Sequence, residues 1–239
     1  MKRIALLVPF LVLAAACEDD RTLRPAARPS VEASTTPATD SPSRSAAPRF
    51  TSAVAHIDAA TRARMSASWR LGCPVPLEDL RLVRLRHWGF DDAHHIGEIV
   101  VHEDVAEDVV RVFRDLFSAR FPIHRMRLVD EYGADDARSM AANNTSAFNC
   151  RRSAGDPSAW SEHAYGRAID INPVHNPYVT SSGGVEPAAG EPFADRSRAR
   201  RGMILSGGPV VRAFRGIGWG WGGTWERSKD FQHFSQSGR

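Results

Sequence analysis

Two stretches far apart in the sequence carry residues that could hold a metal ion and activate a water molecule. His163 and Asp170 stand seven residues apart in SEHAYGRAID, and Asp230 and His233 stand three apart in WERSKDFQHF. Catalytic zinc takes three protein ligands, imidazole nitrogens or carboxylate oxygens, and leaves a fourth position for a water. His163, Asp170 and His233 supply two nitrogens and one oxygen, so we predict that they bind zinc. Asp230 is then placed to act as the general base.

A turn must bring the side chain of His163 back beside that of Asp170. Gly166 permits a bend with an unusual φ, and Ala168 lacks the bulk that would prevent close packing behind the site. If residues 167–171 form a strand, Ala168 and Asp170 share one face of it. The spacing therefore favours a compact turn followed by a short strand.

These residues resemble a known family, the zinc D-alanyl-D-alanine carboxypeptidases and L-alanyl-D-glutamate endopeptidases of bacterial cell-wall metabolism. The family shares S-x-H-x-x-G-x-A-x-D followed by D/E-x-x-H near the end of the domain, on a scaffold also seen in lysostaphin-type peptidases and the hedgehog signalling domain. Here the first motif runs from Ser161 to Asp170 and the second from Asp230 to His233. WGGTW at residues 221–225 precedes the second motif, as in VanY-like members. The resemblance covers about residues 120–235.

The resemblance implies that the three predicted ligands bind Zn²⁺. It also implies that Asp230 takes a proton from the attacking water and delivers it to the leaving amine. The implied substrates are peptidoglycan stem peptides, cleaved either next to a D-amino acid or between L-Ala and D-Glu. Family members also use an arginine upstream of the first histidine to hold a substrate carboxylate or polarise the scissile carbonyl, a contribution worth about 3 to 4 kcal/mol in comparable oxyanion sites. Arg151 is our candidate and Arg152 the near alternative, and Ser161 is assigned to substrate binding.

Two other functions stay open at this stage. The first is a non-catalytic, zinc-stabilised domain that binds the cell wall, and Asp230 discriminates against it because binding needs no base. The second is an exported structural module in which the histidines and aspartates are incidental, which a metal analysis of the purified protein would decide.

The first 17 residues have the pattern of a signal peptide. Lys2 and Arg3 precede an apolar run at 4–16, and Cys17 follows three alanines. Thirteen apolar residues are fewer than the roughly 20 that a membrane-spanning helix needs, so we expect export to the periplasm or cell envelope rather than a lasting span. The alanines and Cys17 resemble a lipobox, and Cys17 either carries a lipid anchor or is lost with the leader.

Residues 18–50 are rich in Pro, Ser, Thr and Ala, a composition typical of a disordered linker. Residues 51–239 are then the zinc peptidase domain, with its motifs in 140–235, while 51–119 carry no motif that we can assign. The formal net charge of +3 falls to about +1 without Lys2 and Arg3, so no nucleic-acid partner is indicated. We expect a monomer. Cys73 and Cys150 are the only cysteines after the leader, and in an exported domain they are expected to form a disulfide.

The hydrophobic patterns predict an α+β domain with a small, mainly antiparallel sheet, flanking helices and long loops that form a zinc cleft. Helices are expected at 53–71 and from an N-cap at Asp104 to Phe121. Strands are expected at 77–88, 97–102, 123–132, 167–171 and 231–235, with long irregular stretches between.

Other notable side chains have simpler interpretations. The tryptophans at 219, 221 and 225 are expected to pack in the core rather than stack on sugars. The arginines at 196, 198, 200 and 201 are interpreted as a solvated helix face. His175 is interpreted as an ordinary loop histidine, with a place in the cleft as the alternative.

Overall fold

A computed structural model describes residues 48–239, which form one compact unit. The expected signal peptide at 1–17 and nearly all of the expected linker at 18–50 lie outside the described residues. Helices are combined with several small sheets, which confirms the α+β class. Three of the four sheets are wholly antiparallel, and the fourth is a short parallel pair.

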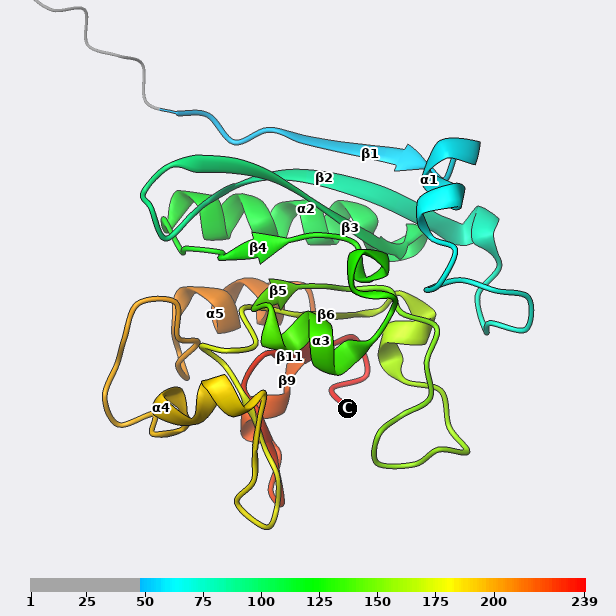
Figure 1. Cartoon of the computed structure of the whole chain (residues 1–239). Coiled ribbons are helices and arrows are strands. Elements are labelled where there is room, and N and C mark those ends of the chain that lie inside the picture. The colour runs from blue at the N-terminus through cyan, green and yellow to red at the C-terminus, as the bar shows by residue number, and fades with distance from the viewer. Residues whose placement is uncertain (1–47) are drawn as a thin grey trace, which may run out of the picture. The chain divides into compact units, whose positions relative to one another are not determined.

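The first layer is an antiparallel sheet with the order β1-β2-β3 (Figure 1). Its strands are β1 (Ser52–His56), β2 (Leu80–Trp88) and β3 (His94–His102). In β2 the leucines at 80, 82 and 85 are buried in the core, whereas Arg84 is exposed and Arg81 and Arg86 are half-buried. β1 is an edge strand whose residues are all exposed.

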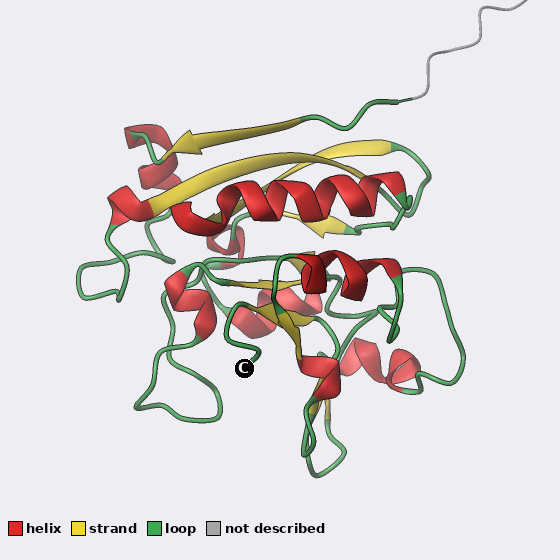
Figure 2. Cartoon of the chain, turned by 180° about the vertical axis from the view of Figure 1, so that it is seen from behind, coloured by secondary structure: helices red, strands yellow, loops and turns green. Residues whose placement is uncertain are grey.

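Helix α2 (Glu103–Ser118) lies against this sheet (Figure 2). Its buried apolar residues serve contacts both with the sheet and with a second helix. This second helix is α5 (Pro209–Gly216), whose Phe214 is fully buried. One hydrophobic core therefore joins the first sheet, α2, α5 and the strands that hold the site.

The strands near the site are short and come from distant parts of the chain. β6 (Ala168–Asp170), β11 (His233–Ser235) and β9 (Gly220–Trp221) form one antiparallel sheet with β11 at its centre. β10 (Lys229–Asp230), β7 (Tyr178–Val179) and β8 (Val185–Glu186) form another. β4 (Arg125–Met126) and β5 (Asn144–Thr145) are the parallel pair.

The remaining elements are short helices in the connections. The α-helices are α1 (Ala59–Arg64), α3 (Asp136–Ala141) and α4 (Glu191–Ala194). The 3₁₀ helices are η1 (Leu77–Asp79), η2 (Val129–Tyr132), η3 (Glu162–Tyr165), η4 (Ala188–Gly190) and η5 (Gly222–Thr224).

Several sequence-based boundaries are wrong. The helix expected at 53–71 is a strand, β1, followed by the six-residue α1, because pairing with β2 determines the structure of the first segment. The cap of α2 is His102, whose side chain accepts a hydrogen bond from the Asp104 amide, so the helix begins two residues earlier than expected. Only β4 of the strand expected at 123–132 is extended, and η2 follows it.

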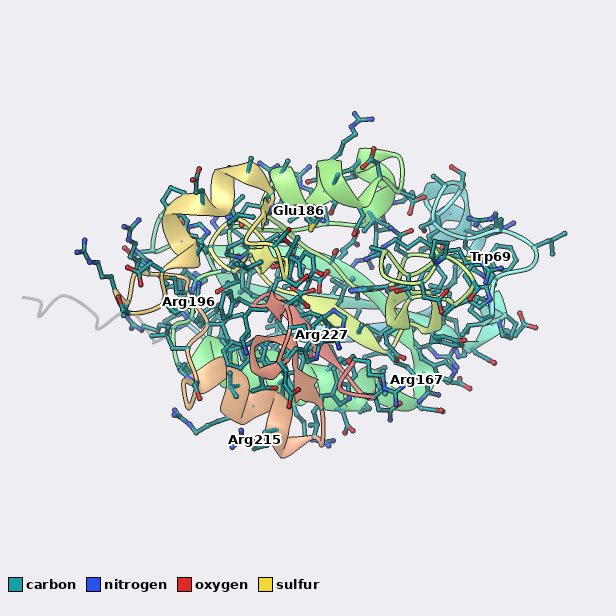
Figure 3. All side chains as sticks on the ribbon, turned by 90° about the horizontal axis from the view of Figure 1, so that it is seen from below. Trp69, Arg167, Glu186, Arg196, Arg215 and Arg227 are labelled. Atoms are coloured by element: carbon teal, nitrogen blue, oxygen red, sulfur yellow. A yellow bond between two sulfur atoms is a disulfide. The ribbon has the colours of Figure 1, made fainter. Side chains whose placement is uncertain are left out.

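The arginine cluster is not a helix face. Arg196, labelled in Figure 3, donates hydrogen bonds to the carbonyls of His175 and Phe193 and to the side chain of Asn176. These contacts stabilise the long connection between β6 and α5, whose secondary structure consists only of short strands and helices. By contrast, Arg198 is exposed as expected.

Two sequence expectations about packing are confirmed. Cys73 and Cys150 form a disulfide, which joins the segment before β2 to the loop before η3. Trp219 and Trp221 are buried in the core, while Trp225 is half-buried. Among the helices of residues 48–239, none has the length and apolar character needed to cross a membrane.

Candidate active site

The pairing of β6 with β11 brings the two sequence motifs together. In this antiparallel register Asp170 stands opposite His233, and Ile169 stands opposite Phe234. Phe234 and Ile169 are fully buried, and Phe234 stacks on Phe214 of α5. Because a slip of one residue would turn these side chains to the wrong face, the core fixes the register that places Asp170 beside His233.

His163 reaches the same place from η3. The Ser161 hydroxyl accepts a hydrogen bond from the His163 amide and caps the helix, and Gly166 ends it with a φ of +65°. A Cβ at Gly166 would lie 2.6 Å from the amide nitrogen of His102, so the turn requires glycine for space as well as for conformation. The expectation of a tight bend at Gly166 is confirmed.

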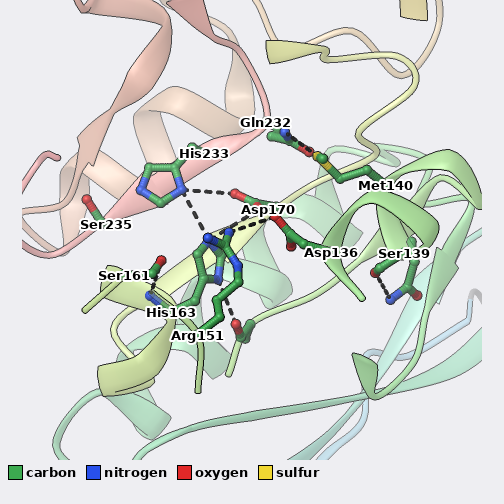
Figure 4. Close-up of polar contacts among 12 residues, drawn as sticks. Asp136, Ser139, Met140, Arg151, Ser161, His163, Asp170, Gln232, His233 and Ser235 are labelled. Carbon is green, nitrogen blue, oxygen red and sulfur yellow. Dashed lines mark hydrogen bonds and ion pairs between the residues drawn. The ribbon is translucent and has the colours of Figure 1, made fainter. Parts of the chain in front are cut away.

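Three buried ligand atoms converge between these elements (Figure 4). His163 Nε2 lies 3.3 Å from His233 Nδ1 and 3.2 Å from Asp170 Oδ2, and His233 Nδ1 lies 3.0 Å from Asp170 Oδ1. These are the three residues that the sequence assigns to the metal. Two imidazole nitrogens and one carboxylate form the donor set of a catalytic zinc site.

The hydrogen bond to the ring of His163 suits metal binding through its Nε2 atom. Its Nδ1 lies 2.6 Å from the carbonyl oxygen of Ala147. Since a carbonyl only accepts, Nδ1 donates the hydrogen bond, and a neutral ring then has its lone pair on Nε2, which faces Asp170 and His233. Metal-binding histidines usually have such a second partner, so the residues present fit a divalent metal ion.

The charges inside the cluster are strongly coupled. Burial alone would raise the pKa of Asp170, but the charge of His163 and hydrogen bonds from both histidines lower it well below its usual range. Burial opposes the charging of His233, yet the hydrogen bond and charge of Asp170 raise the pKa of His233 to about 9. A bound cation would compete with these protons, because metal ligands must be deprotonated.

Asp230 lies next to this cluster, on β10, where it pairs with Tyr178. Its Oδ1 is buried and has no hydrogen-bond partner among the described residues. Burial, followed by the negative charge of Asp170, raises the pKa of Asp230 to about 7. A buried carboxylate with an unpaired oxygen and a pKa close to neutrality has the properties of a general base.

Arg151 and Arg152 differ in their surroundings. Arg151 forms an ion pair with Asp136, with Nη2 at 2.8 Å from Oδ2, and its buried Nε has no partner among the described residues. The Ser161 amide donates a hydrogen bond to the Arg151 carbonyl, so the main chain of Arg151 lies beside the start of η3. By contrast, the guanidinium of Arg152 lies over the Trp160 ring and binds the Ser158 carbonyl. The geometry therefore favours Arg151 as the arginine of the site, and the assignment itself stays a prediction.

Ser161 and His175 also have defined places. Ser161 is buried, and its hydroxyl serves as the cap of η3, so a role in substrate binding stays a prediction. His175 is half-buried between the rings of Phe90 and Phe193, and its Nδ1 lies 2.9 Å from the Asn143 amide group. No contact with the ligand cluster involves His175 among the described residues.

Three neighbours of the site were not identified from the sequence. Asp136, which pairs with Arg151, lies in the first turn of α3, in a stretch without visible periodicity. Ala147 contributes only its carbonyl, which leaves no trace in residue type. Gly222 must be glycine, because an added Cβ would lie 2.7 Å from the Cβ of Asp230. The WGGTW motif was the feature of the sequence that could have identified this position.

The family comparison agrees with this site. Residues 154–236 match the family model described as D-alanyl-D-alanine carboxypeptidase, which confirms the resemblance for roughly a third of the chain. The matched stretch contains both motifs but begins three residues after Arg151. Comparison of the chain with curated proteins and with solved structures finds no match.

The fold, the site and the family match together define a peptidase resembling the D-alanyl-D-alanine carboxypeptidases. A cell-wall peptidase family and the Cys73–Cys150 disulfide both fit an extracellular or envelope location.

Proposed function

We propose that the protein is a zinc-dependent peptidase that hydrolyses peptide bonds involving D-amino acids in peptidoglycan stem peptides. The observation that carries the proposal is the convergence of three buried ligand atoms, on His163, Asp170 and His233, beside the unpaired carboxylate oxygen of Asp230. A structural metal site would need no such base, and it would normally have four protein ligands instead of three.

Each residue would have one task. His163, Asp170 and His233 would hold Zn²⁺, which when bound lowers the pKa of a water molecule and polarises a carbonyl. Asp230 would accept the proton of the attacking water and return it to the leaving amine. The guanidinium of Arg151 would hold a substrate carboxylate or stabilise the negative charge that develops on the carbonyl oxygen. Asp136 would keep that guanidinium in place through the ion pair.

We favour a stem peptide that ends in D-Ala-D-Ala as the substrate. The description of the matching family supports this choice, and so does a guanidinium suited to a terminal carboxylate. Cleavage between L-Ala and D-Glu is the alternative. The lipid anchor at Cys17 and the monomeric state remain predictions.

The test compares the parent chain with Asp230→Asn, which keeps the shape of the side chain but removes the base. Both proteins are loaded with zinc and incubated with purified muropeptides, and mass spectrometry of the products identifies the bond that is cut. We expect Asp230→Asn to retain its zinc and to lose about 10²- to 10⁴-fold in kcat. Asp115→Asn, at an exposed position on α2, is the matched control and is expected to behave like the parent.

The same experiment separates the alternatives. A parent protein that binds zinc and the cell wall but releases no product would support a non-catalytic wall-binding domain. If the purified parent has no affinity for zinc and is insensitive to chelators, the metal site itself is wrong.

A further inference from the structure

The side of His233 that faces away from the ligand cluster contacts the last residues of the sequence. His233 Nε2 lies 2.8 Å from the main-chain oxygen of Arg239. Since this oxygen only accepts, Nε2 donates the hydrogen bond. A neutral His233 held in this way has its lone pair on Nδ1, which is the nitrogen that faces His163 and Asp170.

The oxygen of Arg239 is itself held in place. The hydroxyl of Ser235 donates a hydrogen bond to the same oxygen at 2.7 Å. Ser235 is two residues after His233 on β11, so both side chains leave the strand on the same face, and Ser235 is fully buried. His233 and Ser235, two positions of one strand, thus both donate hydrogen bonds to the main-chain oxygen of Arg239.

Further contacts fix the main chain that leads to this oxygen. The indole of Trp225 donates a hydrogen bond to the Gly238 carbonyl at 2.8 Å, and the Gly238 amide donates one to the Ser235 carbonyl at 3.2 Å. Gly238 has a φ of +78°. A Cβ on Gly220 of β9 would lie 2.5 Å from the Cα of Gly238, so the segment lies directly against the strand. The ring of Trp225 also packs against His233, at 5.6 Å between centroids.

We propose that residues 237–239 form a positioning segment, which fixes the ring orientation and tautomer of His233 through the main-chain oxygen of Arg239 and so raises the affinity of the site for zinc. The inference rests on the metal site of the proposed function. Groups that bind the far nitrogen of a metal-bound histidine typically change metal affinity by about 10- to 100-fold when they are removed. The Arg239 side chain has no part in this role, since only its main-chain oxygen is used.

The experiment measures zinc affinity by competition with a chromophoric chelator in four chains: the parent, a chain that ends at Gln236, Ser235→Ala and Arg239→Ala. We expect the shortened chain to bind zinc about 10- to 100-fold more weakly than the parent, and Ser235→Ala to be weakened in the same direction. Arg239→Ala keeps the main-chain oxygen at this position and is expected to match the parent.

A spectroscopic measurement separates positioning from general destabilisation. In the zinc-loaded parent, the ¹⁵N shifts of His233 are expected to show a metal-bound Nδ1 and a protonated Nε2 whose proton exchanges slowly with solvent. In Ser235→Ala the exchange should accelerate, while thermal unfolding of the metal-free protein changes little.

The proposal is overturned if the folded shortened chain binds zinc within twofold of the parent, or if Nδ1 of His233 carries the proton in the zinc-loaded parent. If the shortened chain does not fold, Ser235→Ala and the ¹⁵N shifts of the parent decide. A parent without zinc affinity would instead contradict the proposed function.

Discussion

Replacing Gly166 by alanine tests whether the turn after η3 positions His163. Gly166 has a φ of +65°, and an added Cβ would lie 2.6 Å from the amide nitrogen of His102 and 3.1 Å from the carbonyl carbon of Val101. Both atoms belong to main chain at the end of β3, where a shift would also disturb the start of α2. The new methyl group therefore cannot be accommodated by a side-chain rotation.

Two costs add up at this position. The left-handed conformation costs an alanine roughly 1 kcal/mol, and forcing a methyl group into packed main chain typically costs about 1 to 3 kcal/mol more. We therefore expect Gly166→Ala to lower the free energy of unfolding by about 2 to 4 kcal/mol, or the Tm by roughly 5 to 15 °C. Because the movement separates His163 from Asp170 and His233, zinc affinity should fall as well.

Gly133 provides the matched control. It has a φ of +72°, but an added Cβ there would meet no atom within 4 Å. Gly133→Ala should then cost only the roughly 1 kcal/mol of conformational strain and leave zinc binding unchanged. Thermal unfolding and chelator competition on both variants measure the difference. Equal stability losses in the two variants, together with unchanged zinc affinity in Gly166→Ala, would refute the reasoning.

Three more predictions concern parts of the fold outside the ligand cluster. Replacing Cys73 and Cys150 by serine should lower the free energy of unfolding by about 4 kcal/mol, because the disulfide closes a loop with a sequence separation of 77 residues. A urea midpoint equal to that of the parent would contradict this prediction. Arg196→Ala should cost about 2 to 3 kcal/mol, since four acceptors lose a charged donor: the carbonyls of His175, Phe193 and Ile204 and the side chain of Asn176. The exposed Arg198→Ala should stay within about 0.5 kcal/mol of the parent. Equal urea stabilities of the two variants would count against a structural role for Arg196. Burial lowers the pKa of His175 to about 4, so the neutral ring contributes stability that is complete above about pH 6.5 and is lost as the pH falls toward 4. Allowing for its partial exposure, the parent should lose about 1 to 2 kcal/mol more than His175→Phe between pH 7 and pH 4 in urea unfolding, and parallel pH profiles would disprove the assignment.

Local patterns in the sequence were enough to predict the elements whose character depends on near neighbours. The apolar residues of α2 recur at helical spacing, and β2 alternates leucine with arginine, so both were located nearly correctly. The segment 53–71 was not, because β1 is extended only through its pairing with β2. Residues with weak local preference take the structure that the partner strand imposes.

The types of side chain needed for a metal site were evident from the sequence alone, because few combinations of histidine, aspartate and glycine at such spacings suit any other chemistry. The glycine at 166 and the disulfide between Cys73 and Cys150 could likewise be inferred from residue type and compartment.

Only the tertiary structure decided which atoms meet. His233 stands opposite Asp170, at a sequence separation of 63, because buried Phe234 and Ile169 fix the register of β11 on β6. The groups that orient the two histidines are main-chain oxygens of Ala147 and Arg239. Because every residue has a main-chain oxygen, the residue types in the sequence could not identify these two partners. Residue type determines which chemistry a chain can perform, whereas the packing of distant segments determines where that chemistry takes place.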